Sequence, residues 1–391
     1  MQNGIRGRQL ERSEVVIVQR RLTHYRVPLF EAMRQDLRER EIRLRLLHGP
    51  ANSAEAAKGD SGHLDWAESL PTRYLLGNQI CWQNFGPLTR DSDLVIVTQE
   101  NKLLSNHWHL VTPRHCRLAF WGHGANLQSR NPKSLQERFK RWTTNRVDWW
   151  FAYTDLSANL VAATGFQDSR ITVINNAVDT TQMRRWMQEI GHEETQTLRR
   201  ELGIKESLIG VFVGSLYVDK RLDFLFAAAE AVRRAIPDFH LLLVGEGPER
   251  DKLRSWCRTH TWAHWVGARF RREKMAYVSL AQVMLNPGSV GLGILDSFVC
   301  GVPIVTTDCR AHGPEIAYLH DGVNGIMTTN DVEAYSTAAV ALLRNEEGRA
   351  RLRVGCRVGA ETYTLENMVQ RFTDGIANCL EAPPHQKQLL G

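Results

Sequence analysis

The sequence predicts an α/β protein of two domains, each built on a doubly wound parallel sheet. Short β-rich runs alternate with helix-length spacers, and strands separated in this way pair in parallel through right-handed crossovers. The alternation occurs in two series, with a charged helical stretch at 183–202 between them. A chain of 391 residues has room for two domains, and no apolar run in it approaches the ~18 to 20 residues of a membrane span.

The first series of expected strands lies in residues 1–180. Each strand is a short run rich in β-branched and large apolar residues: Val15–Gln19, Ile42–Leu47, Leu94–Thr98, Leu118–Trp121 and Ile171–Ile174. The loop after the first strand ends in Pro28, and proline is favoured at the first position of a helix. We therefore expect residues 1–180 to form an amino-terminal Rossmann-like domain.

The second series lies in residues 206–364. Its expected strands are Ile209–Val213, Leu241–Val244, Val283–Leu285 and Ile304–Thr306. The helix after Lys220 is apolar at Leu222, Leu225, Phe226, Ala229 and Val232. This spacing places one face of the helix on a sheet. We expect residues 206–364 to form a second Rossmann-like domain, with residues 181–205 as a linker region.

Composition and charge narrow the class of protein. Residues 1–13 are polar and Arg-rich and lack the apolar core of a secretory signal, and the 7 cysteines form no C-x-x-C pair. Both features favour the cytoplasm and argue against structural zinc. The net charge of +6 arises in residues 1–180, where 24 Lys+Arg face 18 Asp+Glu. This excess indicates either an anionic partner or a solvated surface.

The most informative stretch is 286–325. A short strand leads into the loop Pro287–Gly291 and then into an apolar helix that stops at Gly301. A helix start exposes unpaired backbone N–H groups, and a loop of small residues lets an anion approach them, as phosphate does. Asp296, one turn into the helix, suits hydroxyl groups rather than phosphate. A nucleotide-sugar has both kinds of group.

Several motifs occur in the order expected of one known family: Val213-Gly214-Ser215-Leu216 with Lys220-Arg221, Leu243–Pro248, Trp265–Gly267, Gly291–Asp296 and Cys300–Thr306. As an ordered set they resemble the carboxyl-terminal domain of family 4 (group 1) glycosyltransferases, which have the GT-B fold. The resemblance is looser at Trp121–Gly124 and Asn175–Asp179. It implies two Rossmann-like domains facing across a cleft, with residues 365–391 forming a helix that crosses back to the amino-terminal domain, and a tail.

The resemblance also implies an activity. The chain is expected to be a retaining glycosyltransferase that moves a sugar from a nucleotide-sugar to an acceptor on residues 1–180. We expect the acceptor to be a lipid-linked or cell-surface glycan precursor, and the enzyme to need no cofactor or metal. Asp91-Ser92-Asp93 mimics a D-x-D metal motif, but it precedes a strand and is expected to be a turn.

Donor-binding residues follow from the same resemblance. Lys220 occupies the position of a lysine that grips the donor diphosphate, where a cation stabilises the charge of the leaving group. Ser215 stands in place of the family's arginine, and Arg221 is a candidate replacement. The family's paired glutamates fall on Gly288 and Asp296, so Asp296 is expected to bind the ribose and to be catalytic with Lys220. Sugar contacts are then expected from the backbone of Ser289, Val290, Gly291, Leu292 and Gly293, and base contacts from Ala268 and its neighbours.

The amino-terminal candidates follow two strands. His123, flanked by glycines, is expected to lie beside the transferring sugar and to be catalytic, since imidazole adapts its charge near neutral pH. His24, Tyr25 and Arg26 form the first loop and are expected either to contact the acceptor or the donor phosphates, with Arg26 as the anion contact, or to brace the first helix.

Residues 130–150 carry a further pair of alternatives. Leu135, Phe139 and Trp142 share a helical stripe among six Lys and Arg residues. Such a helix either lies on an anionic membrane, at the inner face of the cell membrane, or packs on the sheet with its cations in water. Nucleic acid is not an expected partner, because no reader motif accompanies the cations. The rival functions are a nucleotide-sugar epimerase or hydrolase of the same fold and a non-catalytic scaffold in polysaccharide assembly.

Overall fold

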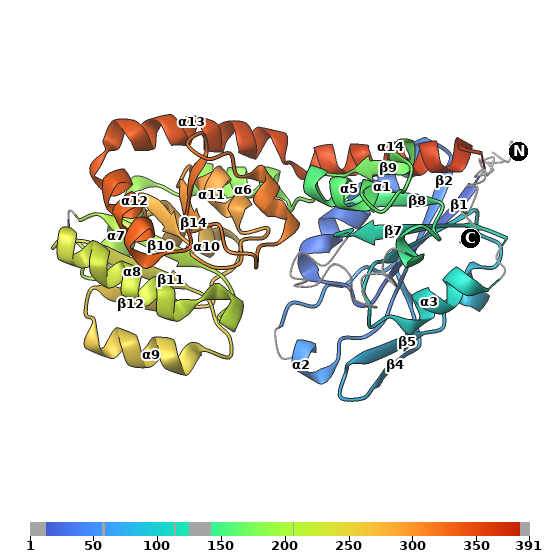
Figure 1. Ribbon diagram of the computed structural model, residues 1–391, viewed down its shortest axis with the longest axis horizontal. Coiled ribbons are helices and arrows are strands. Elements are labelled where there is room, and N and C mark those ends of the chain that lie inside the picture. The colour runs from blue at the N-terminus through green and yellow to red at the C-terminus, as the bar shows by residue number, and fades with distance from the viewer. Residues whose placement is uncertain (1–12, 57–58, 113–114, 125–141, 206, 384–391) are drawn as a thin grey trace, which may run out of the picture. The chain divides into compact units, whose positions relative to one another are not determined.

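The chain has two compact units, which we describe from a computed structural model. The structure describes residues 13–56, 59–112, 115–124, 142–205 and 207–383. Unit 1 comprises Met1–Val178 and Leu365–Gly391, and unit 2 comprises Asp179–Thr364 (Figure 1). Each unit contains its own parallel sheet, so the prediction of two α/β domains is confirmed.

Unit 1 is built on a seven-stranded parallel sheet in the order β3-β2-β1-β6-β7-β8-β9. Its strands are β1 (Ser13–Gln19), β2 (Ile42–His48), β3 (Glu68–Ser69), β6 (Leu94–Thr98), β7 (Arg117–Gly122), β8 (Trp149–Ala152) and β9 (Ile171–Val173). A separate antiparallel hairpin joins β4 (Thr72–Leu75) to β5 (Ile80–Gln83). The described helices are α1 (Val27–Glu39), α2 (Ser53–Ala56), α3 (Leu104–Val111), α5 (Asp155–Ala162) and α14 (Leu365–Glu381).

Strand β8 was not expected from the sequence. Trp149 and Trp150 belong to it and are buried between β7 and β9, so neither is available to a membrane. A strand buried on both faces is apolar throughout and lacks the alternation that identifies half-buried strands. The tryptophans therefore looked like the end of the basic helix at 130–150.

Helix α14 completes unit 1 although it is the last described helix of the chain. Phe372 stacks on Phe151 of β8 with ring centroids 4.4 Å apart, and Asp374 pairs with Arg40 at the end of α1 at 2.7 Å. Aromatic packing of this kind contributes more than the charge pair, which is exposed.

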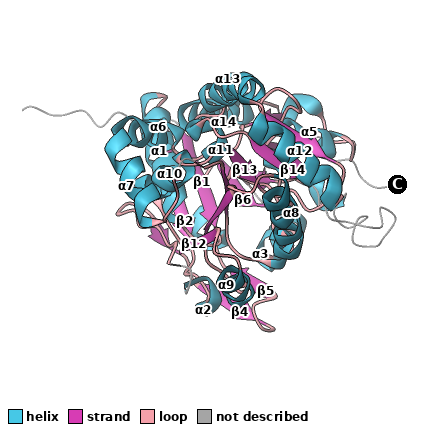
Figure 2. Ribbon diagram, turned by 90° about the vertical axis from the view of Figure 1, so that its left-hand side faces the viewer, coloured by secondary structure: helices cyan, strands magenta, loops and turns pink. Residues whose placement is uncertain are grey.

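Unit 2 is built on a six-stranded parallel sheet in the order β12-β11-β10-β13-β14-β15. The strands are β10 (Ile209–Val213), β11 (His240–Val244), β12 (Ala263–Gly267), β13 (Val283–Leu285), β14 (Ile304–Thr307) and β15 (Gly325–Thr328). The helices are α6 (Thr180–Glu189), α7 (His192–Glu201), α8 (Leu222–Ala235), α9 (Arg250–Thr259), α10 (Arg271–Ser279), α11 (Ile294–Cys300), α12 (Val332–Arg344) and α13 (Glu346–Thr362). Figure 2 shows the helices and strands of both units from a second direction.

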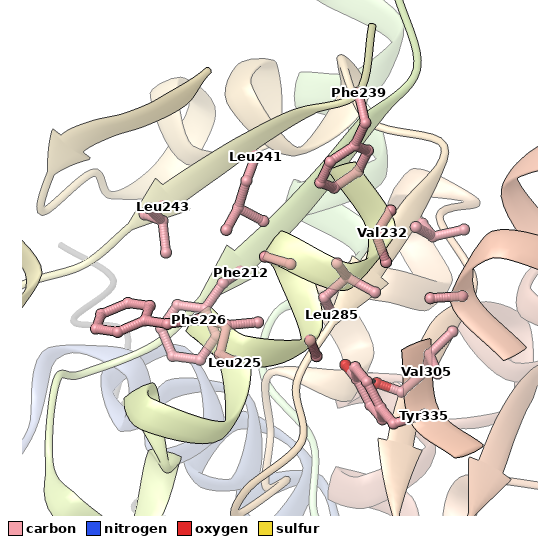
Figure 3. Close-up of a cluster of buried hydrophobic side chains, with 14 of the residues drawn as sticks. Phe212, Leu225, Phe226, Val232, Phe239, Leu241, Leu243, Leu285, Val305 and Tyr335 are labelled. Atoms are coloured by element: carbon pink, nitrogen blue, oxygen red, sulfur yellow. Dashed lines mark hydrogen bonds between the residues drawn. The ribbon is translucent and has the colours of Figure 1, made fainter. Parts of the chain in front are cut away.

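One apolar cluster of unit 2 lies between its sheet and α8 and α12 (Figure 3). All five apolar positions that predicted the face of α8 are buried, from Leu222 to Val232. Tyr335 of α12 is fully buried and its hydroxyl donates to the carbonyl of Val305 at 3.0 Å, so the cluster leaves this polar atom satisfied.

The prediction that residues 181–205 form a linker is corrected by the structure. These residues form α6 and α7, which pack on α10 and α11 and belong to unit 2. Met187 of α6 contacts the thiol of Cys300 with its sulfur, and Arg272 of α10 pairs with Glu194 of α7 at 2.7 Å. High polarity made this stretch look like a connection, whereas one face of each helix is held against the unit.

The topology of unit 2 identifies where a ligand is expected to bind, at the carboxyl ends of its strands, which we call the carboxyl edge of the sheet. From β10 the chain winds outward through β11 and β12, and then returns to place β13, β14 and β15 on the other side of β10. The loops after β10 and β13 therefore leave neighbouring strands in opposite directions. In open parallel sheets, ligands bind at the carboxyl ends of the strands beside this switch point.

Candidate functional site

The loops after β10 and β13 meet at the switch point of unit 2. The Ser289 N–H donates to the carbonyl of Asp219 at 2.9 Å, and the ammonium of Lys220 donates to the carbonyl of Ser289. Two loops that are far apart in the sequence are thus held together by one main-chain hydrogen bond and by the Lys220 side chain. Lys220 is half-buried at their junction.

Gly288 lies where the two loops approach most closely. A Cβ atom at this position would be 2.4 Å from the carbonyl oxygen of Asp219 and 2.7 Å from that of Lys220. These distances are far shorter than any ordinary van der Waals contact, and both neighbours are backbone atoms. The departure from the family at this position is therefore built into the structure, because no side chain fits here.

Lys220 and Arg221 have different surroundings. Burial lowers the pKa of the Lys220 ammonium below its ordinary value, although Asp219 and Cys309 oppose the shift. Arg221 has a left-handed backbone with φ of 57°, and its guanidinium donates to the carbonyl of Pro287 at 3.0 Å. Arg221 thus binds the loop after β13 at Pro287, while Lys220 binds it at Ser289.

His312 was not predicted from the sequence, yet it orients the same loop. Its Nδ1 accepts from the Val290 N–H at 3.2 Å, and its Nε2 lies 2.8 Å from the carbonyl of Thr307. These partners fit the neutral tautomer that carries its proton on Nε2. Gly313 also donates to the carbonyl of Val290 at 2.7 Å. The only sequence signal is its position soon after β14, at the same sheet edge.

The remaining donor candidates surround this edge. Ser215 follows β10 and is exposed, and Ala268 follows β12 and is half-buried. Gly291 and Leu292 are half-buried and Gly293 is exposed, whereas the N–H groups of Ser289 and Val290 already donate to Asp219 and His312. The structure thus brings the predicted donor-binding residues of unit 2 to the carboxyl ends of its strands. Their roles in ligand binding stay predictions.

Asp296 has a partner that the sequence did not reveal. Its Oδ1 lies 2.6 Å from the ammonium of Lys274 on α10. The Asp296 side chain is 6% exposed, whereas that of Lys274 is 26% exposed. The expected ribose-binding carboxylate is therefore recessed and already engaged by a lysine.

The candidates of unit 1 lie around the carboxyl ends of β1 and β7. His123 follows β7, and its ring stands edge-on to that of Tyr153, with centroids 4.7 Å apart. Burial lowers the pKa of His123 below its ordinary value of 6.5, with nearby Arg26 acting in the same direction and Glu100 opposing it. The His123 side chain is nevertheless exposed to solvent. A neutral imidazole at a strand end is able to donate one hydrogen bond and to accept another.

Arg26 is held inside unit 1. Its guanidinium donates to Asn176 Oδ1 at 2.7 Å and lies 5.1 Å from the ring of Trp121, and the residue is 6% exposed. His24 Nδ1 lies 3.2 Å from the carbonyl of Asp60, while Tyr25 is 38% exposed. These contacts favour the bracing interpretation for Arg26 and His24, and leave Tyr25 as the member of the loop open to a ligand.

The D-x-D sequence at 91–93 and the basic stretch at 130–150 add no residue to the candidate site. Asp93 accepts from the Glu14 N–H at 2.8 Å, as expected of a turn that opens β6. Among the described residues, no three His, Cys, Asp or Glu side chains are grouped to hold a metal ion, and no helix is long and apolar enough to cross a membrane. Residues 130–141, which make up more than half of the stretch predicted as a basic helix, lie outside the described residues.

Comparison with known proteins finds a family whose sequence model matches most of unit 2. The sequence model of the family Glycosyl transferases group 1 matches residues 208–345. A GDP-mannose-dependent alpha-(1-6)-phosphatidylinositol monomannoside mannosyltransferase of Mycolicibacterium smegmatis is 29% identical over 173 residues, which are 41% of this chain and 45% of that protein. An uncharacterized glycosyltransferase of Haemophilus influenzae is 21% identical over 47% of this chain and 53% of its own. The matches thus span about half the length of these relatives.

Solved structures match the whole fold. HepE of Anabaena, crystallised in complex with UDP, has a TM-score of 0.70 at 15% identity, covering 93% of this chain and 99% of that one. WaaG, a glycosyltransferase involved in lipopolysaccharide biosynthesis, has a TM-score of 0.62 at 14% identity, covering 92% and 98%. The two parallel-sheet units have the GT-B fold, as the resemblance implied.

Proposed function

We propose that the protein is a retaining glycosyltransferase that uses a nucleotide-sugar, because residues 208–345 match the family Glycosyl transferases group 1 and the chain has the GT-B fold. The observation that carries this proposal is the junction of two loops at the switch point, where the Lys220 ammonium lies beside the loop after β13, whose last residues Gly291–Gly293 are not buried. A diphosphate that binds there would favour the charged ammonium and so offset the effect of burial.

Lys220 has a defined task in this reaction. The bond between the anomeric carbon and the phosphate oxygen breaks, and negative charge develops on the departing diphosphate. A cation already in place stabilises that charge without reorganisation. The bond to the acceptor oxygen forms on the same face of the sugar, and the acceptor's proton passes to the departing phosphate oxygen. No metal is required for any of these steps.

The acceptor is proposed to be a lipid-linked or cell-surface glycan precursor held by unit 1. One relative is named as acting on a phosphatidylinositol mannoside, and one structural neighbour as acting in lipopolysaccharide biosynthesis. The excess of cations in residues 1–180 supports an anionic acceptor or a peripheral contact with an anionic membrane from the cytoplasmic side.

A panel of nucleotide-sugars tests the proposal. UDP- and GDP-sugars are compared by thermal shift, and the best ligand is then incubated with glycolipid acceptors. We expect one class to raise the melting temperature and to release its sugar to an acceptor. Release of nucleoside diphosphate without an acceptor would favour a hydrolase or epimerase, and binding without turnover would favour a scaffold, the rival that Gly288 and Ser215 support.

The pH dependence of turnover tests the proposed role of His123. Because the pKa of His123 is lowered below 6.5, the ring is neutral at pH 7 and gains its proton only in more acidic solution. We expect kcat to fall as the pH drops through this lowered pKa, and His123→Ala to lower kcat more than donor affinity and to remove the acidic inflection. An inflection above pH 6.5, or one that persists in the variant, contradicts this role.

A further inference from the structure

Cys309 and His312 form a thiol–imidazole pair at the carboxyl edge of the unit 2 sheet. Cys309 is the second residue after β14, and its Sγ lies 3.5 Å from the His312 Nε2. The Cys309 N–H donates to the Thr307 hydroxyl at 3.3 Å, which ties the turn to the end of the strand. A cysteine within hydrogen-bond reach of an imidazole that is itself oriented by other contacts is the arrangement of an activated thiol. The proposed sugar transfer makes no use of this thiol.

The surroundings of Cys309 favour its thiolate. Burial raises the pKa of the thiol, but hydrogen bonds from the His312 ring and the Ala311 backbone outweigh burial and lower this pKa to about 7. About half of the thiol is therefore ionised at neutral pH. Burial lowers the pKa of the Lys220 ammonium, and Cys309 opposes that shift, so the thiolate lies in the field of the same cation.

Other cysteines of the chain lack this activation. Burial raises the pKa of Cys257 to about 11 and the pKa values of Cys356 and Cys379 to about 12. Cys257 is half-buried, whereas Cys309 is 9% exposed. Because Cys257 is the more accessible of these two residues, faster reaction at Cys309 reports activation of its sulfur and not access to it.

His312 connects the Cys309 sulfur to the loop after β13. The His312 Nδ1 accepts from the Val290 N–H at 3.2 Å, while its Nε2 lies 2.8 Å from the carbonyl of Thr307 and 3.5 Å from the sulfur. Because Cys309 is only 9% exposed, an atom added to its sulfur has little free space and presses on the ring. A modified sulfur therefore disturbs the hydrogen bond at Val290.

We propose that Cys309 is a modification site at which hydrogen peroxide forms a sulfenic acid, and that this change releases the loop after β13 from His312. The thiolate sulfur attacks one peroxide oxygen, the O–O bond breaks, and hydroxide leaves and is protonated to water. The sulfur is oxidised by two electrons and the peroxide is reduced. A reducing thiol returns the sulfenic acid to the thiol, so the change is reversible.

Alkylation and peroxide treatment of the intact protein test the site. At pH 7, iodoacetamide is expected to label Cys309 roughly 100-fold faster than Cys257, because a thiolate fraction about 10,000 times larger outweighs the lower nucleophilicity of the more acidic thiol. His312→Leu is expected to slow the labelling of Cys309, while Cys257 in the same protein reports any loss of fold. After peroxide, dimedone is expected to trap a sulfenic acid on the peptide that contains Cys309, as measured by mass spectrometry.

Hydrogen–deuterium exchange measures the release of the loop. Exchange in the peptide 286–293 is expected to be faster after peroxide, to return to its first rate after dithiothreitol, and to be insensitive to peroxide in Cys309→Ser. Equal labelling of Cys309 and Cys257, or no sulfenic acid on Cys309, would overturn the site. Unchanged exchange in the oxidised protein would overturn the release of the loop.

Oxidation is also expected to weaken the binding of UDP or GDP in the parent and not in Cys309→Ser. This effect on the donor is the one part of the inference that rests on the proposed function. If the parent binds no nucleoside diphosphate, the proposed function fails, whereas labelling, trapping and exchange still decide whether Cys309 is the modification site.

Discussion

Replacing Lys220 with alanine is expected to lower the rate of sugar transfer by roughly 100- to 1,000-fold, the loss typical when one preorganised electrostatic group is removed from an active site. The ammonium is half-buried where the loops after β10 and β13 meet, and it donates to the carbonyl of Ser289. In this environment its charge acts on the leaving diphosphate with little screening by water. Initial rates at saturating donor, with the dissociation constant of the nucleoside diphosphate, measure the effect.

Two variants control for a displaced loop. Lys220→Met keeps the length of the side chain and is expected to lose nearly as much activity as Lys220→Ala, because the charge rather than the packing is removed. Lys252→Ala changes an exposed lysine of α9 that pairs with Asp223 and Glu249, and is expected to leave the rate unchanged. Parent-like transfer by Lys220→Met would refute the electrostatic role.

Gly288→Ala is expected to destabilise unit 2 by about 1 to 3 kcal/mol, as overpacked substitutions do, and to weaken donor binding as well. The added Cβ would lie 2.4 Å from the carbonyl oxygen of Asp219, and that oxygen already accepts from the Ser289 N–H. One of the two loops must therefore move, and the loop that carries Lys220 moves with it. Gly288→Glu, which would restore the glutamate that the family resemblance places there, is expected to be worse.

Gly293→Ala is the matched control for stability. Gly293 lies in the same loop, has a helical backbone with φ of −61°, and a Cβ there would have no atom within 4 Å. Its melting temperature is expected to equal or exceed that of the parent, since alanine restricts the unfolded chain. Thermal unfolding of the two variants side by side decides the matter: a Gly288→Ala protein as stable as Gly293→Ala would show that the close approach is unimportant.

The sequence predicted most strands because their apolar residues are clustered and bounded by turns. Leu94–Thr98, Ile209–Val213 and Val283–Leu285 have the bounds expected for them. Strand β8 escaped because a fully buried strand has no alternation, and its two tryptophans extended a helical pattern. Strands β12 and β15 escaped because each is short, includes a polar residue and has a glycine at one end.

Within the candidate site, only the residues that belong to the sequence motifs could be predicted. Lys220, Asp296 and the loop before α11 were placed at one sheet edge by the order of the motifs. Lys274 and His312 were missed because their importance depends on partners brought close by the fold, Asp296 for one and Val290 for the other. Likewise, the sequence shows that Gly288 lacks a side chain, but only the structure shows that Asp219 leaves no room for one.

Hydrogen–deuterium exchange with and without a nucleoside diphosphate shows whether the loops after β10 and β13 bind the diphosphate of the donor through Lys220 and main-chain amides. If they do, UDP or GDP slows exchange in peptides covering 214–221 and 286–293, and Lys220→Met removes this protection. Protection confined to other segments, or equal protection in the variant, would contradict this binding.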